Sequence, residues 1–448
     1  MKDRLIKARD RPLGLPELIA IALGGMVGGG IFSVLGVSVE FIGRATPVAI
    51  LIGGALAFFA AYSYVKLALY YKDEGATYSF FKKTFPASPF SAAVIGWFVV
   101  FGYISTLALY AFTFASYFGS LFPTGETPWL RTVIAGSIIL VFAIINLVSV
   151  KGMGKVEDVM VYTKLVLLLF IAGLLAGKGD IQRVLPLVDM DSSIPTIVMI
   201  AALTFVAFEG FQLVVHAYRE METPERNVPR AIYSAIVIAT LLYVVLAVGA
   251  LSAIPQAEII ADKEYALAAG SERILGRLGY FVVLFGALLA TSSAISGTLF
   301  GASRLMAVIA DDGHFPRSLG FHAKLAIPRN AIVLMSLLAF LLILFGGLRI
   351  ILEFGSVTFI LVSFLMAVSN FKMRKETGSH VVFTLIAMIG LFAAGTLIIV
   401  FELQHSPEQL IPIGVIYAAL IAGAWLRSKW IAQRGILAGS DEGPGIRL

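Results

Sequence analysis

Long apolar stretches, separated by short polar segments, make up most of the chain. A helix needs about 20 largely apolar residues to cross the hydrocarbon core of a bilayer. Twelve stretches are expected as helices of this kind: 15–41, 46–70, 91–118, 131–149, 157–177, 194–218, 230–253, 276–309, 331–346, 350–371, 380–401 and 409–427. The pattern therefore predicts an all-α integral membrane protein with twelve transmembrane helices.

The composition excludes an ordinary soluble domain. Hydrophobic residues make up 59% of the chain and charged residues 14%, whereas charged residues are roughly a quarter of a soluble protein. The longest polar stretches, 254–275 and 311–330, are too short for a separate domain. We therefore expect an N-terminal segment at 1–14, one membrane domain at 15–428 and a C-terminal tail at 429–448.

The basic residues predict the orientation. The net charge is +6, but Lys and Arg fall at helix ends and form no single patch, so nucleic acid is not an expected partner. In the twelve-helix topology, 25 of them lie on the side that holds both termini and 8 on the other. Because cytoplasmic loops carry the excess of Lys and Arg, we expect a multi-pass protein of the cell (inner) membrane with both termini in the cytoplasm.

Two further features of the chain concern processing and cofactors. The first apolar run follows a charged segment and is too long for a signal-peptide core, so it is expected to remain as the first helix. The chain has no cysteine, which excludes disulfides, thiol catalysis and thiolate metal ligands. No cofactor is expected.

Glycine interrupts two of the predicted helices near their middles. The first contains Gly24-Gly25-Met26-Val27-Gly28-Gly29-Gly30 and the sixth Phe208-Glu209-Gly210-Phe211. The two helices are five positions apart in the order of helices, the spacing expected of two inverted five-helix repeats, here 15–177 and 194–371, with the helices of 380–428 appended. Broken backbone in a membrane is tolerated where it lines a cavity or meets a ligand. The alternative for the first helix is that its glycines serve close helix packing.

The ends of the broken helices suggest the ligand. A half-helix that starts after Gly28 would direct the N–H groups of Gly29, Gly30 and Ile31 at a carboxylate. The first half of the sixth helix would end in free carbonyl groups at Phe205, Val206 and Phe208, which suit an ammonium group. Carboxylate and ammonium together describe an α-amino acid.

Lys164 lies about eight residues inside the fifth predicted helix. An ionised lysine at membrane depth costs at least a few kcal/mol. It either extends to the cytoplasmic interface or occupies a cation position and exchanges a proton during transport. Ser292 and Ser293 in the eighth helix are candidates to solvate its ammonium, although such hydroxyls often bond their own backbone.

Glu209 lies inside the break of the sixth helix, where it is expected to face the cavity. Three roles stay open for its carboxylate. It contacts the ammonium of the substrate, holds a proton, or pairs with a basic residue as part of the structure.

At these residues the chain resembles the amino acid, polyamine and organocation transporter superfamily, up to about residue 430. Four segments carry the resemblance: Gly28-Gly29-Gly30-Ile31-Phe32, Phe208-Glu209-Gly210-Phe211, the 222–231 loop, and the segment from Arg304 through Asp311-Asp312-Gly313-His314-Phe315-Pro316. The resemblance implies the five-plus-five inverted-repeat fold and alternating access. The chain also resembles a prokaryotic subset of this superfamily that has a lysine in the fifth helix. This second resemblance implies that protons are the coupling ion and that Lys164 is the coupling residue.

The resemblance also assigns roles to backbone groups. It implies that Gly29 and Gly30 bind the substrate carboxylate and that the carbonyls of Met26, Val206 and Glu209 bind its ammonium. Many relatives have an apolar residue where Glu209 stands and an acidic one where Gln212 stands. A carboxylate beside the pocket would favour a cationic amino acid or a polyamine, so this substrate class stays open.

Several other functions compete with proton-coupled amino acid uptake. An exchanger or a sodium-coupled transporter uses the same architecture, although Lys164 argues against sodium at its position. A potassium transporter of related fold is less favoured. A membrane-embedded enzyme would need converging polar groups, but the histidines occupy helix ends or loops: His216, His314, His322, His380 and His405.

Overall fold

The computed structural model describes residues 12–122, 127–148, 153–188, 193–262, 265–320 and 327–433. Within these ranges the chain is almost entirely helical, and its only strand-like pairing is an isolated bridge between Leu13 and Met221. The predicted all-α fold class is confirmed. Parts of the predicted N-terminal segment (1–11) and tail (434–448) lie outside the described residues.

Each of the twelve predicted spans coincides with one or more helices over its described residues. Ten stretches are long and apolar enough to cross a membrane, and two of these, Gly29–Tyr71 and Arg329–Lys372, each include parts of two predicted helices. The helices are α1 (Leu15–Met26), α2 (Gly29–Ile42), α3 (Thr46–Tyr71), α4 (Ala76–Thr84), α5 (Pro89–Gly119), α6 (Pro128–Val148), α7 (Met153–Lys178), α8 (Ile194–Thr204), α9 (Pro224–Ala253), α10 (Gln256–Asp262), α11 (Ala266–Asp311), α12 (Arg329–Lys372), α13 (Val381–His405) and α14 (Pro407–Gln433). Five 3-10 segments complete the described helical structure: η2 (Gly43–Ala45), η3 (Ile181–Arg183), η4 (Phe205–Phe208), η5 (Phe211–Ala217) and η7 (Arg317–Leu319).

Several boundaries differ from the predicted ones. Helix α9 begins six residues before the expected start at 230, because a proline is tolerated in the first turn of a helix and Pro224 occupies it. The expected loop at 254–275 contains α10 and the first turns of α11, which bends at Gly276. The ninth and tenth predicted helices are joined in α12, where Gly347 at φ +65° separates them. These helix ends were predicted wrongly because short amphipathic helices carry charged residues, and charged stretches were expected to be loops.

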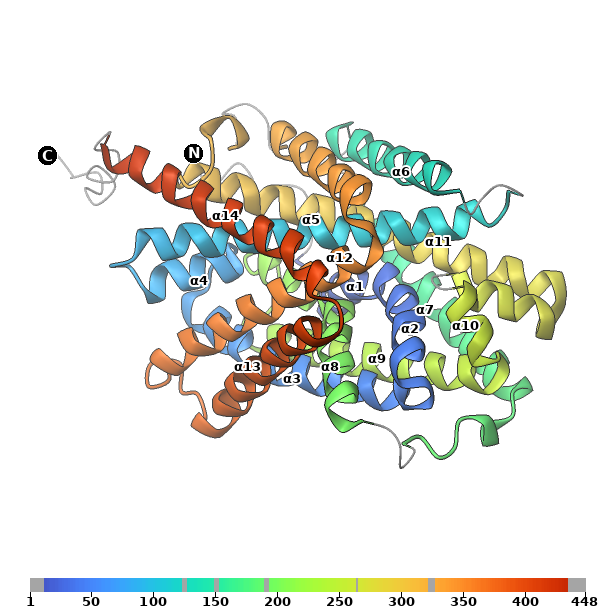
Figure 1. Ribbon diagram of the computed structural model, residues 1–448. Helices are drawn as coiled ribbons and strands as arrows, with labels where there is room; N and C mark the ends of the chain where they lie inside the picture. Colours follow the sequence, from blue (N-terminus) through green and yellow to red (C-terminus); the bar gives the residue numbers. More distant parts are fainter. Residues whose placement is uncertain are drawn as a thin grey trace, which may run out of the picture.

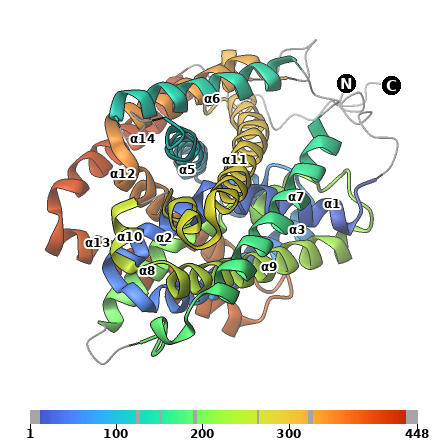
Figure 2. The ribbon, with the colours of Figure 1, turned by 90° about the vertical axis from the view of Figure 1, so that its right-hand side faces the viewer.

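The helices form a buried centre and a lipid-facing periphery. Helix α5 and the stretch from α8 to η5 are mostly buried, while α6, α13 and α14 expose large apolar side chains. In the end-on view α5 lies inside the ring of helices and α6 at its edge (Figure 2). Figure 1 shows α4 and α10 at opposite ends of the molecule. An apolar exterior of this kind is expected where the solvent is lipid.

Both predicted helix breaks are present, and both are near the buried centre. The first predicted helix consists of α1 and α2, separated by Val27 and Gly28. The sixth consists of α8, η4 and η5, with Glu209 and Gly210 between the two 3-10 segments. The division of the chain into two inverted repeats stays a prediction.

Candidate functional site

The break in the first membrane-spanning helix lies at Gly28. Its φ and ψ angles, −126° and −143°, are not helical, and α2 starts at Gly29. This start, which the sequence predicted, places Gly29, Gly30 and Ile31 in the first turn of α2. The N–H groups of a first turn have no partner within their own helix and carry the positive end of its dipole.

The break in the sixth helix requires a glycine. Glu209 is extended, and Gly210 has a φ of +124°, a region that L side chains rarely adopt. A Cβ atom at Gly210 would lie 2.5 Å from the carbonyl carbon of Gly25 in α1. The two broken helices therefore cross with their backbones in contact.

Above this crossing, the start of α2 packs against η4. A Cβ atom at Gly30 would lie 3.1 Å from the Cα atom of Ala207. Gly28 and Gly29 face other helices: added Cβ atoms would lie 2.6 Å from the Cβ of Ala294 and 2.7 Å from Oγ1 of Thr113. The packing interpretation of these two glycines is therefore supported by the geometry, whether or not the same backbone also binds a ligand.

Two tyrosine hydroxyls form hydrogen bonds with the backbone at the breaks. The sequence did not predict these contacts. The Tyr243 hydroxyl of α9 lies within hydrogen-bond distance of two carbonyl oxygens, that of Met26 at 2.8 Å and that of Ala207 at 3.0 Å. The Tyr110 hydroxyl of α5 donates to the Gly25 carbonyl at 2.7 Å. Tyrosines inside apolar predicted helices were the available signal, because the hydroxyl of a buried tyrosine usually has a partner.

The other predicted carbonyl acceptors lie at the same crossing. The Val206 carbonyl accepts a hydrogen bond from the Glu209 N–H at 3.2 Å, and Phe205 and Phe208 begin and end η4. All four residues are buried. The structure thus brings the predicted substrate-binding residues together, and their contact with a substrate stays a prediction.

Lys164 points into the protein. Its side chain is completely buried, and its ammonium donates to the Gly24 carbonyl at 3.1 Å and to the Ser293 hydroxyl at 2.8 Å. It thus joins α7 to α1 and α11. Ser292, the other predicted hydroxyl, is only partly buried and points elsewhere, because successive residues of a helix face different directions.

Within the residues that the structure describes, no three His, Asp or Glu side chains come together as metal ligands would. The Lys164 amine is the basic group that lies where α1, α7 and α11 meet.

Glu209 is held across the break by its own helix. Gln212 Nε2 donates to Glu209 Oε2 at 2.5 Å, and the Gly210 N–H donates to Gln212 Oε1 at 3.2 Å. The second carboxylate oxygen, Oε1, is buried and has no hydrogen-bond partner among the described residues. Glu209 therefore retains one oxygen that a ligand or a proton can use.

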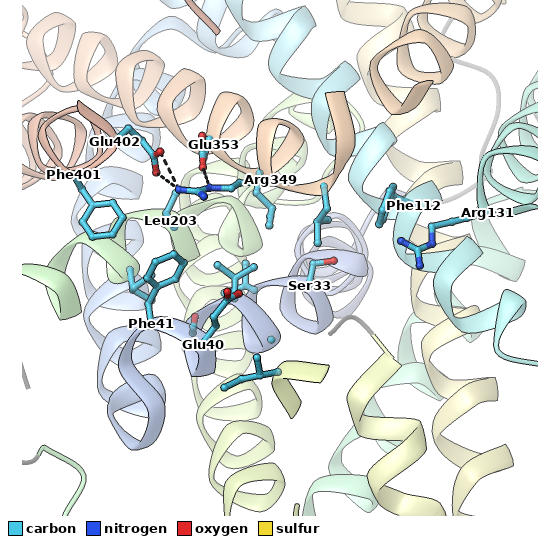
Figure 3. Close-up of a pocket in the computed structure, with 18 residues that line it drawn as sticks. Ser33, Glu40, Phe41, Phe112, Arg131, Leu203, Arg349, Glu353, Phe401 and Glu402 are labelled. Carbon is cyan, nitrogen blue, oxygen red and sulfur yellow. Dashed lines mark hydrogen bonds and ion pairs between the residues drawn. The ribbon is translucent and has the colours of Figure 1, made fainter. Parts of the chain in front are cut away.

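A cavity of about 410 Å³ begins one helical turn beyond the breaks. Its inner wall includes Ser33 of α2 and Leu203 of α8, and it extends to Arg349, Glu353 and Glu402 (Figure 3). The predicted substrate-binding residues lie deeper and do not line this cavity. Ile260 of α10 also lines it.

Comparison with known proteins then assigns the family. The sequence model of the amino acid permease family matches residues 13–425, which include both breaks and Lys164. The chain belongs to the amino acid permease family. As a permease it is a transporter and not an enzyme, and its predicted superfamily is confirmed.

Individual relatives agree with this family. The chain is 31% identical over 313 residues to the inner membrane transport protein YbaT of Escherichia coli, covering 69% of this chain and 71% of that protein. It is 27% identical over 347 residues to the branched-chain amino acid permease BcaP of Bacillus subtilis, with 72% of each covered. It is also 28% identical over 395 residues to the uncharacterized protein MJ0609 of Methanocaldococcus jannaschii, covering 86% of this chain and 89% of that protein.

Proposed function

We propose that this permease takes up amino acids across the cell membrane by alternating access and couples uptake to protons through Lys164. Both termini would lie in the cytoplasm, and the cavity that ends at Arg349 would open to the outside. The observation that carries the proposal is the buried Lys164 ammonium between the Gly24 carbonyl and the Ser293 hydroxyl.

The amino acid part of the proposal is supported by the two helix breaks. The first turn of α2 presents N–H groups that suit a carboxylate, and the carbonyl ends at Met26 and Val206 suit an ammonium. A carbonyl oxygen has two lone pairs, so the contact of Met26 with Tyr243 leaves a second position open. The name of the Bacillus subtilis relative specifies branched-chain amino acids, and we propose a neutral α-amino acid as the first substrate to test.

The proton part is supported by the contacts of Lys164. A protonated amine donates to both oxygen acceptors and holds α1 against α7 and α11. A neutral amine is a weaker donor, so loss of the proton would loosen α1 from its neighbours. Because α1 is one half of a broken helix, its release would change access to the crossing of the two breaks.

Glu209 supports a second candidate, a cationic amino acid or polyamine as substrate. Its Oε1 atom is buried without a partner among the described residues, and a cationic side chain would supply one. In this version the transporter fold and the role of Lys164 are unchanged. An exchange mode would likewise use the same residues.

Purified protein in liposomes separates these functions. We expect accumulation of labelled neutral amino acids under an inward proton gradient, with cationic amino acids and rubidium tested in parallel. Thermal stabilisation of the detergent-solubilised protein by individual amino acids identifies the substrate, since binding raises apparent stability by mass action. Rubidium uptake without amino acid uptake would contradict the proposal and favour a potassium transporter.

A further inference from the structure

Two buried carboxylates share one arginine at the outer part of the cavity. Arg349 follows the bend of α12 at Gly347, and its Nε atom donates to Glu353 Oε1 at 2.6 Å, one turn along the same helix. Its Nη2 atom donates to both oxygens of Glu402 in α13, at 3.2 and 3.0 Å. Figure 3 shows the guanidinium between the two carboxylates.

The burial of these three side chains is unequal. The Glu353 and Glu402 side chains are each 2% exposed, whereas that of Arg349 is 40% exposed. Two ionised carboxylates and one guanidinium leave a net charge of −1. A buried charge without a partner costs several kcal/mol, so this arrangement calls for one more positive charge.

One carboxylate oxygen of this cluster lacks a partner. Glu353 Oε2 is buried and has no hydrogen-bond partner among the described residues, while Glu353 Oε1 is bound by Arg349. Glu353 and Glu402 line the 410 Å³ cavity and also a second cavity of about 180 Å³ between α12, α13 and α14. Glu353 Oε2 is therefore an acceptor that lies beside a cavity and lacks a donor.

The other titratable groups around the pair do not supply that charge. Glu40 of α2 lines the same cavity and is acidic, and His405 of α13 stacks on Phe401 and hydrogen bonds within α13. Tyr417 of α14 shares its hydroxyl with Thr358 at 2.7 Å. Arg131 of α6 is near the ring of Phe112, on the opposite wall in Figure 3.

We propose that Glu353 and Glu402 together bind one proton and form a second proton site of this permease, separate from Lys164. A hydronium ion in the cavity transfers its proton to the Glu353 carboxylate, which leaves water and a neutral carboxylic acid, and no electron moves. The pair then carries one negative charge, which Arg349 balances. The exposed part of Arg349 marks the aqueous route by which the proton arrives.

The proton changes the net charge of the cluster that joins α12 and α13. When it is bound, Arg349 contacts both carboxyl groups and the cluster of three side chains is neutral. Without it, the cluster carries a net negative charge that would attract a cation into the cavity. If the proposed proton-coupled uptake is correct, the pair makes entry into the cavity depend on the pH of the outer solution, independently of the gradient sensed at Lys164.

Infrared difference spectroscopy of the purified protein tests the proton directly, because a protonated carboxyl group has a stretching band that a carboxylate lacks. We expect such a band near neutral pH, shifted in heavy water, with one component that is lost in both Glu353→Gln and Glu402→Gln; a component from a protonated Glu209 is identified by its loss in Glu209→Gln. Each variant keeps one carboxylate for Arg349, so it is expected to fold. Glu40→Gln, at an exposed carboxylate of the same cavity, serves as the matched control and is expected to retain the band.

A stability measurement covers the case in which a variant folds poorly. Arg349→Gln leaves two buried carboxylates and is expected to unfold at a lower temperature than the wild type, with partial recovery on acidification. A carboxyl band that keeps its wild-type intensity in both Glu353→Gln and Glu402→Gln, or an Arg349→Gln protein whose stability does not respond to acid, would overturn the proposal. Neither readout requires transport, so failure here is distinct from failure of amino acid uptake.

Discussion

The Lys164 ammonium lies 3.1 Å from the carbonyl oxygen of Gly24, two residues before α1 ends at Met26. A lysine in α7 thus binds the backbone of a helix that is broken a few residues later. The same ammonium reaches Ser293 in α11. One buried side chain therefore joins three helices beside the candidate substrate site.

Tyr243 is expected to hold the two breaks together. Its hydroxyl lies near the Met26 and Ala207 carbonyls, and Tyr243→Phe would leave both without this donor. A buried polar group without a partner costs about 1–3 kcal/mol. We expect the free energy of unfolding to fall by about that amount and amino acid uptake to fall with it, as measured by thermal unfolding in detergent and by proteoliposome uptake. Tyr70→Phe, at an exposed tyrosine, is expected to change neither. If the two variants had the same stability and uptake, Tyr243 would have no role in holding the breaks together.

Gly30 is expected to tolerate no side chain. The Cβ atom of Gly30→Ala would lie 3.1 Å from the Ala207 Cα atom, so the two broken helices would have to shift by a few tenths of an ångström to accommodate it. Alanine favours helix by about 1 kcal/mol over glycine, so a loss of function would not come from a weaker helix. We expect weaker substrate binding in a folded, membrane-inserted protein, measured by ligand-induced thermal stabilisation.

The control for Gly30 is Gly173→Ala in α7, where an added Cβ meets no atom within 4 Å. It is expected to bind substrate as the wild type does. Unchanged binding in Gly30→Ala would argue that the crossing does not contact the substrate. Larger substitutions at Gly29 are less informative, because they would clash with Thr113 whether or not a ligand is bound.

Glu209→Gln addresses the choice of substrate. The substitution removes a negative charge beside the breaks, and the amide oxygen of the new side chain can still accept a hydrogen bond from Gln212 Nε2. We expect uptake of cationic amino acids to fall relative to neutral ones, measured by competition in proteoliposomes. A change in pH dependence without a change in preference would assign Glu209 to the proton instead. Glu225→Gln, at an exposed carboxylate, is the control.

The sequence predicted the helices and the breaks because both depend on local composition. Apolar length marked the spans, and glycine clusters marked Gly28 and Gly210 as positions where the helix ends. The starts of α9 at Pro224 and of α11 at Ala266 were misplaced, because short polar helices at a membrane surface do not differ in composition from loops.

The partners of the broken backbone could not be predicted from sequence. The carbonyls of Gly25 and Met26 meet Tyr110 and Tyr243, which lie far away in the chain. Sequence reasoning assigned such carbonyls to a ligand, because it had no means of placing other helices around them. Ser293 was predicted together with Ser292, and only helix geometry separates the two.

The central claim is that the proton on Lys164 drives uptake, and Lys164→Ala tests it most directly. Wild-type and variant proteins are reconstituted into liposomes, and uptake of the identified amino acid is measured with and without an inward proton gradient, in sodium or choline buffer. We expect wild-type uptake to rise with the proton gradient and to be indifferent to sodium, and we expect Lys164→Ala to lose the gradient dependence. Sodium-dependent uptake by the wild type, or an unchanged proton response in Lys164→Ala, would contradict the mechanism.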